Sequence, residues 1–234
     1  MASRQMDEHL NSVSTSQLVT FAGDDVRLAG QMDYPIQAQP SGGYPLIFII
    51  QHATCNSRKG YEHYVTMGTG LGIAVFRWDK RGTGSSGAGG GGSINIDTLK
   101  AYETALSQPG INADMSFILA QNEGTMLLGD AYKQFKKIQK PRGIILAGNM
   151  LDEEAVMTLD VPLHIVVSKN DWNAWQIYAK GAAEAHAAKY KYRPSFYVAT
   201  NTDRRLMYTN GETFHRGAQA SISHWLQQLC QTSS

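Results

Sequence analysis

The stretch of residues 117–128 constrains the fold more than any other part of the sequence. It reads Phe-Ile-Leu-Ala-Gln-Asn-Glu-Gly-Thr-Met-Leu-Leu. An apolar run ends at a polar corner, passes Gly124 and continues as a second apolar run. Because short polar corners between apolar runs mark a change of element, this pattern predicts a strand, a sharp turn and a helix.

Apolar runs of strand length recur along the chain, with segments of helix length between most of them. They span residues 46–50, 73–76, 115–119, 143–147, 163–167 and 196–199. Strands without a polar face are typical of a sheet that is buried on both sides. We therefore predict an α/β fold, with a mostly parallel central sheet and helices on both faces. We predict an antiparallel hairpin over residues 19–21 and 26–32 before this sheet. Only the short segment of residues 148–160 separates two successive strands, so it leaves no room for a large lid domain.

Composition predicts one domain without a strongly charged partner. The chain has 234 residues, of which 42% are hydrophobic, and a formal net charge of +1. We assign residues 1–16 to a flexible N-terminal segment and residues 17–234 to a single domain. The near-neutral charge offers no field for nucleic acid, and no run is apolar enough for a signal peptide or a membrane span. We therefore expect a cytoplasmic protein, and the two cysteines fit a reducing compartment.

No motif for a metal or a cofactor stands out. No set of histidine, cysteine or carboxylate residues has the spacing of metal ligands. The glycine tract at residues 87–92 lacks the lysine and hydroxyl residue of a phosphate-binding loop, so it reads as a surface spacer. We expect neither a metal nor a cofactor.

Small residues around Asn122 indicate that the predicted turn is a nucleophile elbow. In the pattern Gly-x-Ser-x-Gly, small residues flank the nucleophile because the turn is strained and neighbouring backbones come close. Here the frame reads Ala120-x-Asn122-x-Gly124. An amide has no ionisable proton to give to a base and is a very poor nucleophile. The usual route through an acyl-enzyme therefore lacks its attacking atom.

Taken together, these residues resemble the α/β-hydrolase superfamily, in particular its small, lidless branch of esterase-like and acyl-hydrolase-like proteins. The resemblance rests on His52 after a buried strand, the segment Asp79–Gly87 after the next, the elbow, Asp171 and His215. It runs from about residue 19 to the end of the chain. The segment after Asp79 is the most specific of these marks.

The resemblance implies a role for each matching position. Asn122 occupies the nucleophile position, Asp171 matches the acid of the triad and His215 matches the base. Their order along the chain is the order that this superfamily uses. The backbone N–H of Glu123 matches one donor of the oxyanion hole, and the second donor would come from the loop after His52.

Two neighbours in that loop, Ala53 and Thr54, are the candidates for this second oxyanion donor. Cys55 follows them and is either a small buried residue or a reactive thiol in place of the missing serine. Asp171 could instead cap a helix, in which case Asp152, after another strand end, is the reserve acid. His215 could be a surface histidine beside a helix start.

Three functions are compatible with these residues. The first is an ester, thioester or lactone hydrolase whose serine has been replaced, in evolution or by an introduced change. The second is a non-hydrolytic acid–base enzyme (a lyase, isomerase, decarboxylase or cyclase) in which the Asn122 amide donates a hydrogen bond. The third is a protein that only binds a ligand. Large apolar side chains near the strand ends would suit an apolar or aromatic small molecule: Trp78, Met126, Met150, Trp172, Trp175 and Phe214.

Overall fold

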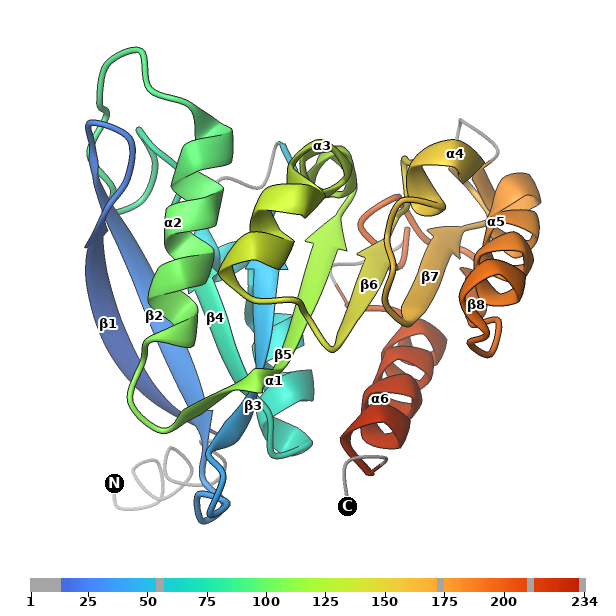
Figure 1. The fold of residues 1–234 in the computed structure, drawn as a ribbon, viewed down its shortest axis with the longest axis horizontal. Helices are drawn as coiled ribbons and strands as arrows, with labels where there is room; N and C mark the ends of the chain where they lie inside the picture. The colour runs from blue at the N-terminus through green and yellow to red at the C-terminus, as the bar shows by residue number, and fades with distance from the viewer. Residues whose placement is uncertain (1–13, 54–56, 172–174, 210–212, 232–234) are drawn as a thin grey trace, which may run out of the picture.

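The computed structural model describes residues 14–53, 57–171, 175–209 and 213–231, and in this part the strands form an eight-stranded sheet (Figure 1). The strand order is β1-β2-β4-β3-β5-β6-β7-β8. The strands are β1 (Ser14–Ala22), β2 (Arg27–Pro35), β3 (Tyr44–Ile50), β4 (Ala74–Trp78), β5 (Ile111–Gln121), β6 (Gly143–Ala147), β7 (Leu163–Ser168) and β8 (Phe196–Ala199). The β1–β2 and β2–β4 pairs are antiparallel and the other pairs are parallel. The predicted fold class and the leading hairpin are confirmed.

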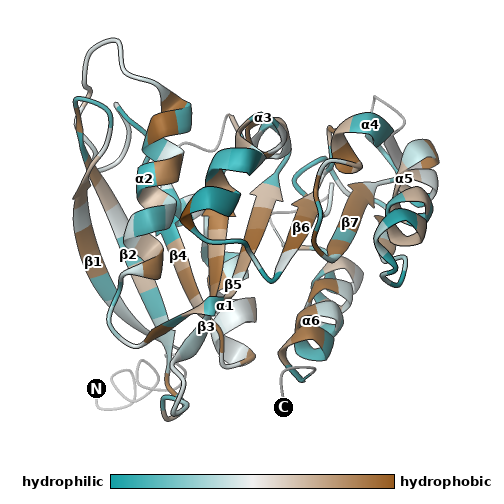
Figure 2. Ribbon diagram, in the orientation of Figure 1, coloured by the Kyte–Doolittle hydropathy of each residue, from teal (hydrophilic) through white to brown (hydrophobic). Residues whose placement is uncertain are grey.

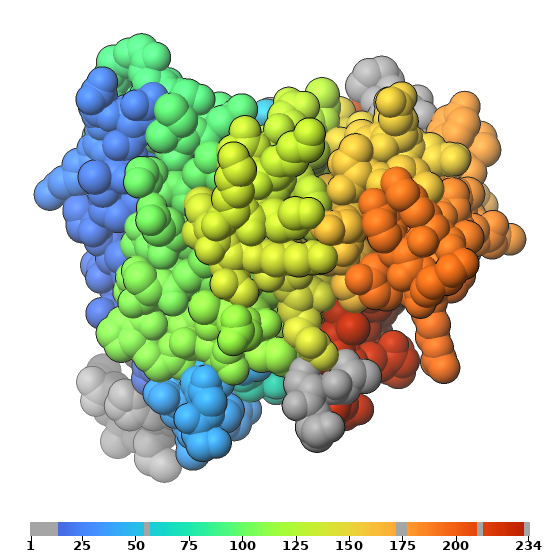
Figure 3. Space-filling view, in the orientation of Figure 1, coloured from blue at the N-terminus to red at the C-terminus, as the bar shows by residue number. Residues whose placement is uncertain are grey.

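Helices connect the strands and cover both faces of the sheet (Figure 1). They are a 3₁₀ turn η1 (Arg58–Tyr61), α1 (Glu62–Gly70), α2 (Ile94–Leu106), α3 (Glu123–Ile138), α4 (Glu153–Val156), α5 (Trp175–Tyr190) and α6 (Arg216–Gln231). The side chains of α2, α3, α4 and α5 lie over the sheet on the face seen in Figure 3. Only α4 lies between β6 and β7, in agreement with the predicted absence of a large lid there.

The apolar runs are continuous because each central strand contributes to two cores. In β3, Leu46, Phe48 and Ile50 pack into the core under α2, α3 and α5. The alternate residues Ile47 and Ile49 pack into the core under α1 and α6. Successive side chains of a strand point to opposite faces, so both registers must be apolar. Figure 2 shows the result, with brown central strands between helices that are teal on their outer surfaces.

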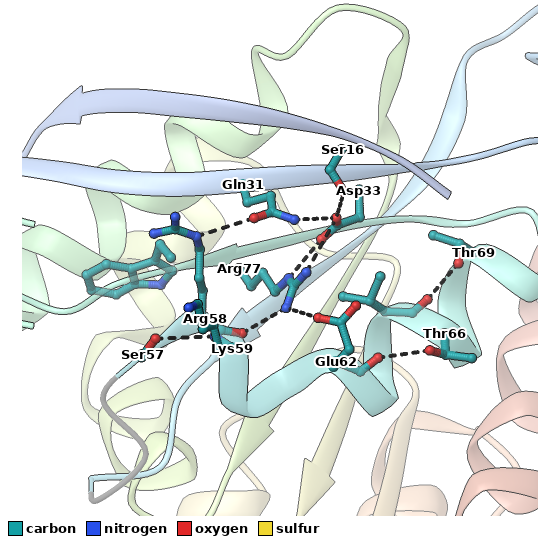
Figure 4. Close-up of polar contacts among 12 residues, drawn as sticks. Ser16, Gln31, Asp33, Ser57, Arg58, Lys59, Glu62, Thr66, Thr69 and Arg77 are labelled. Carbon is teal, nitrogen blue, oxygen red and sulfur yellow. Dashed lines mark hydrogen bonds and ion pairs between the residues drawn. The ribbon is translucent and has the colours of Figure 1, made fainter. Parts of the chain in front are cut away.

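A buried ion pair links the antiparallel part of the sheet to α1 (Figure 4). Asp33 on β2 is fully buried and accepts a 2.8 Å hydrogen bond from Nε of Arg77 on β4. Ser16 Oγ on β1 and Gln31 Nε2 also donate to Asp33, at 2.6 and 2.7 Å. Arg77 bonds Glu62, the first residue of α1, in addition. Each charge is thus compensated by several partners, as buried charges require.

His164 is a second buried polar group, held between β7 and α6. Its Nδ1 lies 2.8 Å from Ser195 Oγ and its Nε2 lies 3.1 Å from Ser221 Oγ. The ring stacks on Trp225 with centroids 5.7 Å apart. Burial lowers the pKa of His164 to about 4. A histidine in such a site is neutral at pH 7 and resists protonation while the chain is folded.

Removing the carboxylate of Asp33 should destabilise the fold strongly. Asp33→Asn removes the buried counter-charge of Arg77 and leaves it only the exposed carboxylate of Glu62, and breaking a buried pair in this way costs about 3–5 kcal/mol. The exposed pair of Lys100 and Glu103 provides the control, since Glu103→Gln should change the free energy of unfolding by less than about 0.5 kcal/mol. Urea denaturation of both variants checks this. Equal effects would mean that Arg77 finds another partner.

Stability should fall as the pH falls from about 6.5 to 4. The pKa of His164 is lowered in the folded chain, so the unfolded chain binds more protons in this interval and the folded state loses stability on acidification. The slope from one such group approaches about 1.4 kcal/mol per pH unit. Urea denaturation at pH 7, 6, 5 and 4 should show a shallower slope for His164→Gln. The exposed His224→Gln should keep the wild-type slope, and an unchanged slope in both would assign the effect to other groups.

Candidate active site

Asn122 forms the sharp turn between β5 and α3. Its backbone has φ 49° and ψ −117°, in the region that residues other than glycine rarely adopt. Its N–H donates to Ala147 O at 2.9 Å on the adjacent strand β6. Its carbonyl accepts from both the N–H and Oγ1 of Thr125, at 2.8 and 2.6 Å. These bonds hold the strained conformation, and the predicted strand, turn and helix are confirmed.

Two glycines make room for this turn. A Cβ on Gly124 would lie 2.6 Å from Ile50 O and 2.9 Å from Gln51 O, so only glycine lets α3 approach the end of β3 this closely. A Cβ on Gly148, after β6, would lie 2.4 Å from Asn122 Oδ1. The sequence pattern identified Gly124 but not Gly148, because Gly148 is far from the elbow in sequence.

The side chain of Asn122 is fully buried, and neither its Oδ1 nor its Nδ2 has a hydrogen-bond partner among the described residues. A buried polar atom without a partner costs about 1–3 kcal/mol. Buried amides normally have partners, as the neighbouring Asn149 shows, whose Oδ1 and Nδ2 bond the N–H and carbonyl of Leu151 at 3.1 and 3.0 Å. Asn122 therefore combines backbone strain with an unsatisfied side chain.

His215 lies just before α6 and is engaged with that helix. Its ring Nδ1 accepts a 3.0 Å hydrogen bond from the backbone N–H of Ala218. The backbone N–H of His215 donates to Leu206 O at 2.9 Å. A neutral imidazole that accepts at Nδ1 carries its proton on Nε2. Burial lowers the pKa of His215, which favours this neutral form. In this orientation the ring caps the helix.

Asp171 follows β7 and faces the loop between β8 and α6. Its side chain is nearly buried, and Oδ1 lies 3.8 Å from a guanidinium nitrogen of Arg204. Within the described ranges, no hydrogen bond or ion pair joins Asp171 to His215. Asp152, the reserve acid, is exposed and caps α4 by accepting from Ala155 N at 2.8 Å. Among the described residues, no hydrogen bond thus links Asn122, Asp171 and His215, the positions predicted to hold the nucleophile, the acid and the base.

The carboxylate of Glu123 fills the region expected for the oxyanion hole. Ala53 donates its N–H to Glu123 Oε2 at 3.3 Å. Nδ1 of His52 lies 3.4 Å from the same oxygen, and Arg204 lies 3.5 Å from Oε1. Thr54 and Cys55, the other candidates in this loop, lie outside the described residues. Sequence reasoning placed the backbone of Glu123 here but gave its side chain no role, and it missed Arg204, whose loop carries no motif.

A cavity of about 380 Å³ opens beside this carboxylate. Its walls come from the ends of β3 and β4 and the starts of α2 and α3, and Trp78 and Met126 line it as expected. Met150 lines a smaller neighbouring cavity, whereas Phe214 packs against His63 and Tyr64 in the core on the other face. Trp172 and the side chain of Trp175 lie outside the described part.

Neither a candidate metal site nor a candidate membrane-spanning helix is found among the described residues. They contain no group of three or more histidine, cysteine, aspartate or glutamate residues that could hold a metal ion. No helix in the described ranges is both long and apolar enough to cross a bilayer.

Comparison with known proteins identifies the fold. No protein-family model matches the sequence, and no curated protein sequence matches it either. Among solved structures, a protein of unknown function from Agrobacterium tumefaciens, proposed to be an α/β hydrolase, has a TM-score of 0.70 at 14% identity, covering 93% of this chain and 98% of that one. The esterase domain of a Rhodothermus marinus protein gives 0.65 at 16% identity, covering 92% and 99%.

A third match is longer than this chain. A Bacteroides ovatus protein proposed to be a dipeptidyl aminopeptidase IV gives a TM-score of 0.64 at 14% identity, and the match covers 92% of this chain but only 36% of that one. These structures share the α/β-hydrolase fold. The chain therefore has this fold, as the sequence predicted.

Substitutions of Asn122 should separate the free-energy cost of its strained backbone from that of its unsatisfied amide. Asn122→Ala removes the unsatisfied amide but keeps the strained backbone, whereas Asn122→Gly also relieves strain worth about 1–3 kcal/mol. We expect Asn122→Gly to be the more stable of the two by at least about 1 kcal/mol. The satisfied amide of Asn149 is the control, because Asn149→Ala should lose about 1–3 kcal/mol. Thermal and urea denaturation test this, and a strongly destabilised Asn122→Gly would show that the amide makes a stabilising contact.

Proposed function

We propose that this chain is an α/β-hydrolase-fold enzyme of the ester, thioester or lactone hydrolase type in which Asn122 occupies the nucleophile position. Acyl-enzyme hydrolysis is accordingly impaired in the chain as it stands. The observation that carries the proposal is the strained, buried turn at Asn122. A strained backbone persists only where the surrounding structure imposes it, and such strain is typical of functional sites. The asparagine amide has no hydrogen-bond partner among the described residues, so no contact seen there favours asparagine at this position.

A nucleophile at position 122 would need the surrounding groups to act together. His215 would have to receive the nucleophile's proton, with Asp171 orienting its ring. That arrangement requires Nδ1 of His215 to leave the N–H of Ala218 and to donate to an acceptor instead. Backbone N–H groups of Glu123 and Ala53 would then stabilise the oxyanion. In this proposal His215 and Asp171 have no catalytic role while position 122 lacks a nucleophile.

The cavity beside α3 supports a small-molecule substrate with an apolar part. Ile50, Trp78, Met126 and Leu127 line it, together with polar residues that include Lys80 and Glu123. Pockets of this size and character hold small organic ligands.

The non-hydrolytic alternative has less support. The burial of the Asn122 side chain bears equally on both readings, and the preference for hydrolysis rests on the solved structures that share this fold, which include an esterase domain. The third function, ligand binding without chemistry, would use the same cavity. The Asn122→Ser experiment distinguishes it from the hydrolase.

Asn122→Ser should convert the chain into an active esterase. Because a serine Oγ restores the attacking atom, turnover of short activated esters should rise by at least about 10²-fold, and a covalent serine-hydrolase probe should label the variant. Asn122→Ala and Asn122→Ser/His215→Gln are the controls and should stay at the wild-type level. Hydrolysis and labelling are measured in parallel. If Asn122→Ser folds but neither turns over nor labels, the pocket is not built around an acyl-enzyme step.

A further inference from the structure

The carboxylate of Glu123 lies among nitrogen donors from other parts of the chain. Glu123 is the first residue of α3, and its side chain is 33% exposed. Its two carboxylate oxygens lie within 3.3–3.5 Å of the Ala53 N–H, the His52 imidazole and the Arg204 guanidinium. These donors come from two separate segments: His52 and Ala53 are adjacent in the loop after β3, and Arg204 lies in the loop between β8 and α6. Their convergence on one carboxylate is not a local effect of the helix terminus.

The electrostatics show that the donors favour the ionised carboxylate. Burial on its own would raise the pKa of Glu123, but the backbone N–H groups of Glu123 itself and Ala53, together with the charges of His52 and Arg204, lower it overall. Both N–H groups are the ones expected to stabilise an oxyanion. The site therefore already binds a carboxylate, and hydrogen bonds between ionised and neutral groups are stronger than those between neutral ones.

Two of the donor residues also have partners other than Glu123. The backbone N–H of His52 donates to Tyr61 Oη at 2.8 Å, and its carbonyl accepts from Lys80 Nζ at 2.6 Å. Arg204 also faces Asp171 at 3.8 Å. The Glu123 side chain is 33% exposed, so solvent reaches it. Donors that keep other partners lose less order when one carboxylate replaces another, which favours such an exchange.

The position of the cavity defines what could replace Glu123. Ala53 and Glu123 both line the cavity of about 380 Å³, whose other walls include Trp78, Met126 and Leu127. A ligand that places its carboxylate on the donors would extend its remaining atoms along this apolar wall. This geometry selects a carboxylate on an apolar or aromatic body and disfavours a bare inorganic anion, which would gain nothing from the wall.

We infer that His52, the Ala53 N–H and Arg204 form a carboxylate-binding site that Glu123 occupies until a carboxylate with an apolar body displaces it. The inference deepens the proposed function and rests on it, since it names carboxylate-bearing substrates or products for the same pocket. It also accounts for the position of the Glu123 carboxylate against the Ala53 N–H, which is one of the expected oxyanion donors.

Calorimetric titration of the full chain with phenylacetate tests this, with its neutral analogue phenylacetamide as the ligand control. Wild type should bind phenylacetate weakly because Glu123 competes. Glu123→Ala should bind it at least tenfold more tightly than wild type does, and at least tenfold more tightly than it binds phenylacetamide. Glu153→Ala is the matched variant, since Glu153 also begins a helix but has no hydrogen bond or ion pair with these donors among the described residues, and it should keep the wild-type affinity.

Two further variants keep the test decisive. Glu123→Ala/Arg204→Gln should lose the gain in affinity. If Glu123→Ala does not fold, Glu123→Gln removes the competing charge while keeping the shape, and it should shift the affinity in the same direction. Equal binding of acid and amide, or no gain in either Glu123 variant, overturns the inference.

The readout does not depend on turnover, so the two proposals can fail separately. Phenylacetate binding together with an inert Asn122→Ser variant overturns the proposed hydrolase and leaves the carboxylate site. An active Asn122→Ser variant together with no gain in phenylacetate binding overturns the carboxylate site and leaves the hydrolase.

Discussion

The close approach of α3 to the end of β3 is the constraint on which the site depends. Gly124 allows the helix to begin beside the carbonyls of Ile50 and Gln51, and this fixes where β5 must turn. The turn then has only one position for Asn122, at a positive φ and inside the protein. Glu123 follows at the first position of the helix and meets the loop after β3. The packing of two backbones thus decides the placement of Asn122 and Glu123.

Much of the fold was predictable, because it follows from patterns local to the chain. Continuous apolar runs predicted strands buried on both faces, and β3 shows why, with alternate residues in separate cores. Element ends were less accurate: β5 begins at Ile111 rather than near residue 115, since its first residues are half-exposed and do not form an apolar run. The elbow was visible because small residues and a polar corner coincide within a few positions.

The directions of the polar side chains could not be predicted in the same way. The motif places His215 before the last helix, but which of its ring nitrogens meets Ala218 depends on a rotamer. Arg204 lies in a loop without a pattern and reaches the site through tertiary packing alone. The sequence pattern gave a role only to the backbone of Glu123, whereas the structure places its side chain against Ala53, His52 and Arg204. Such interactions depend on distances between remote segments, which a single sequence does not contain.

The residue at position 122 also bears on how this sequence could have evolved. Every codon for asparagine differs from a codon for serine at a single base, so the two residues are neighbours in the genetic code. The turn depends on Gly124, on Gly148 and on the close packing of α3 against the end of β3. A single base change would therefore place a serine at position 122 without altering any of the residues that hold the turn.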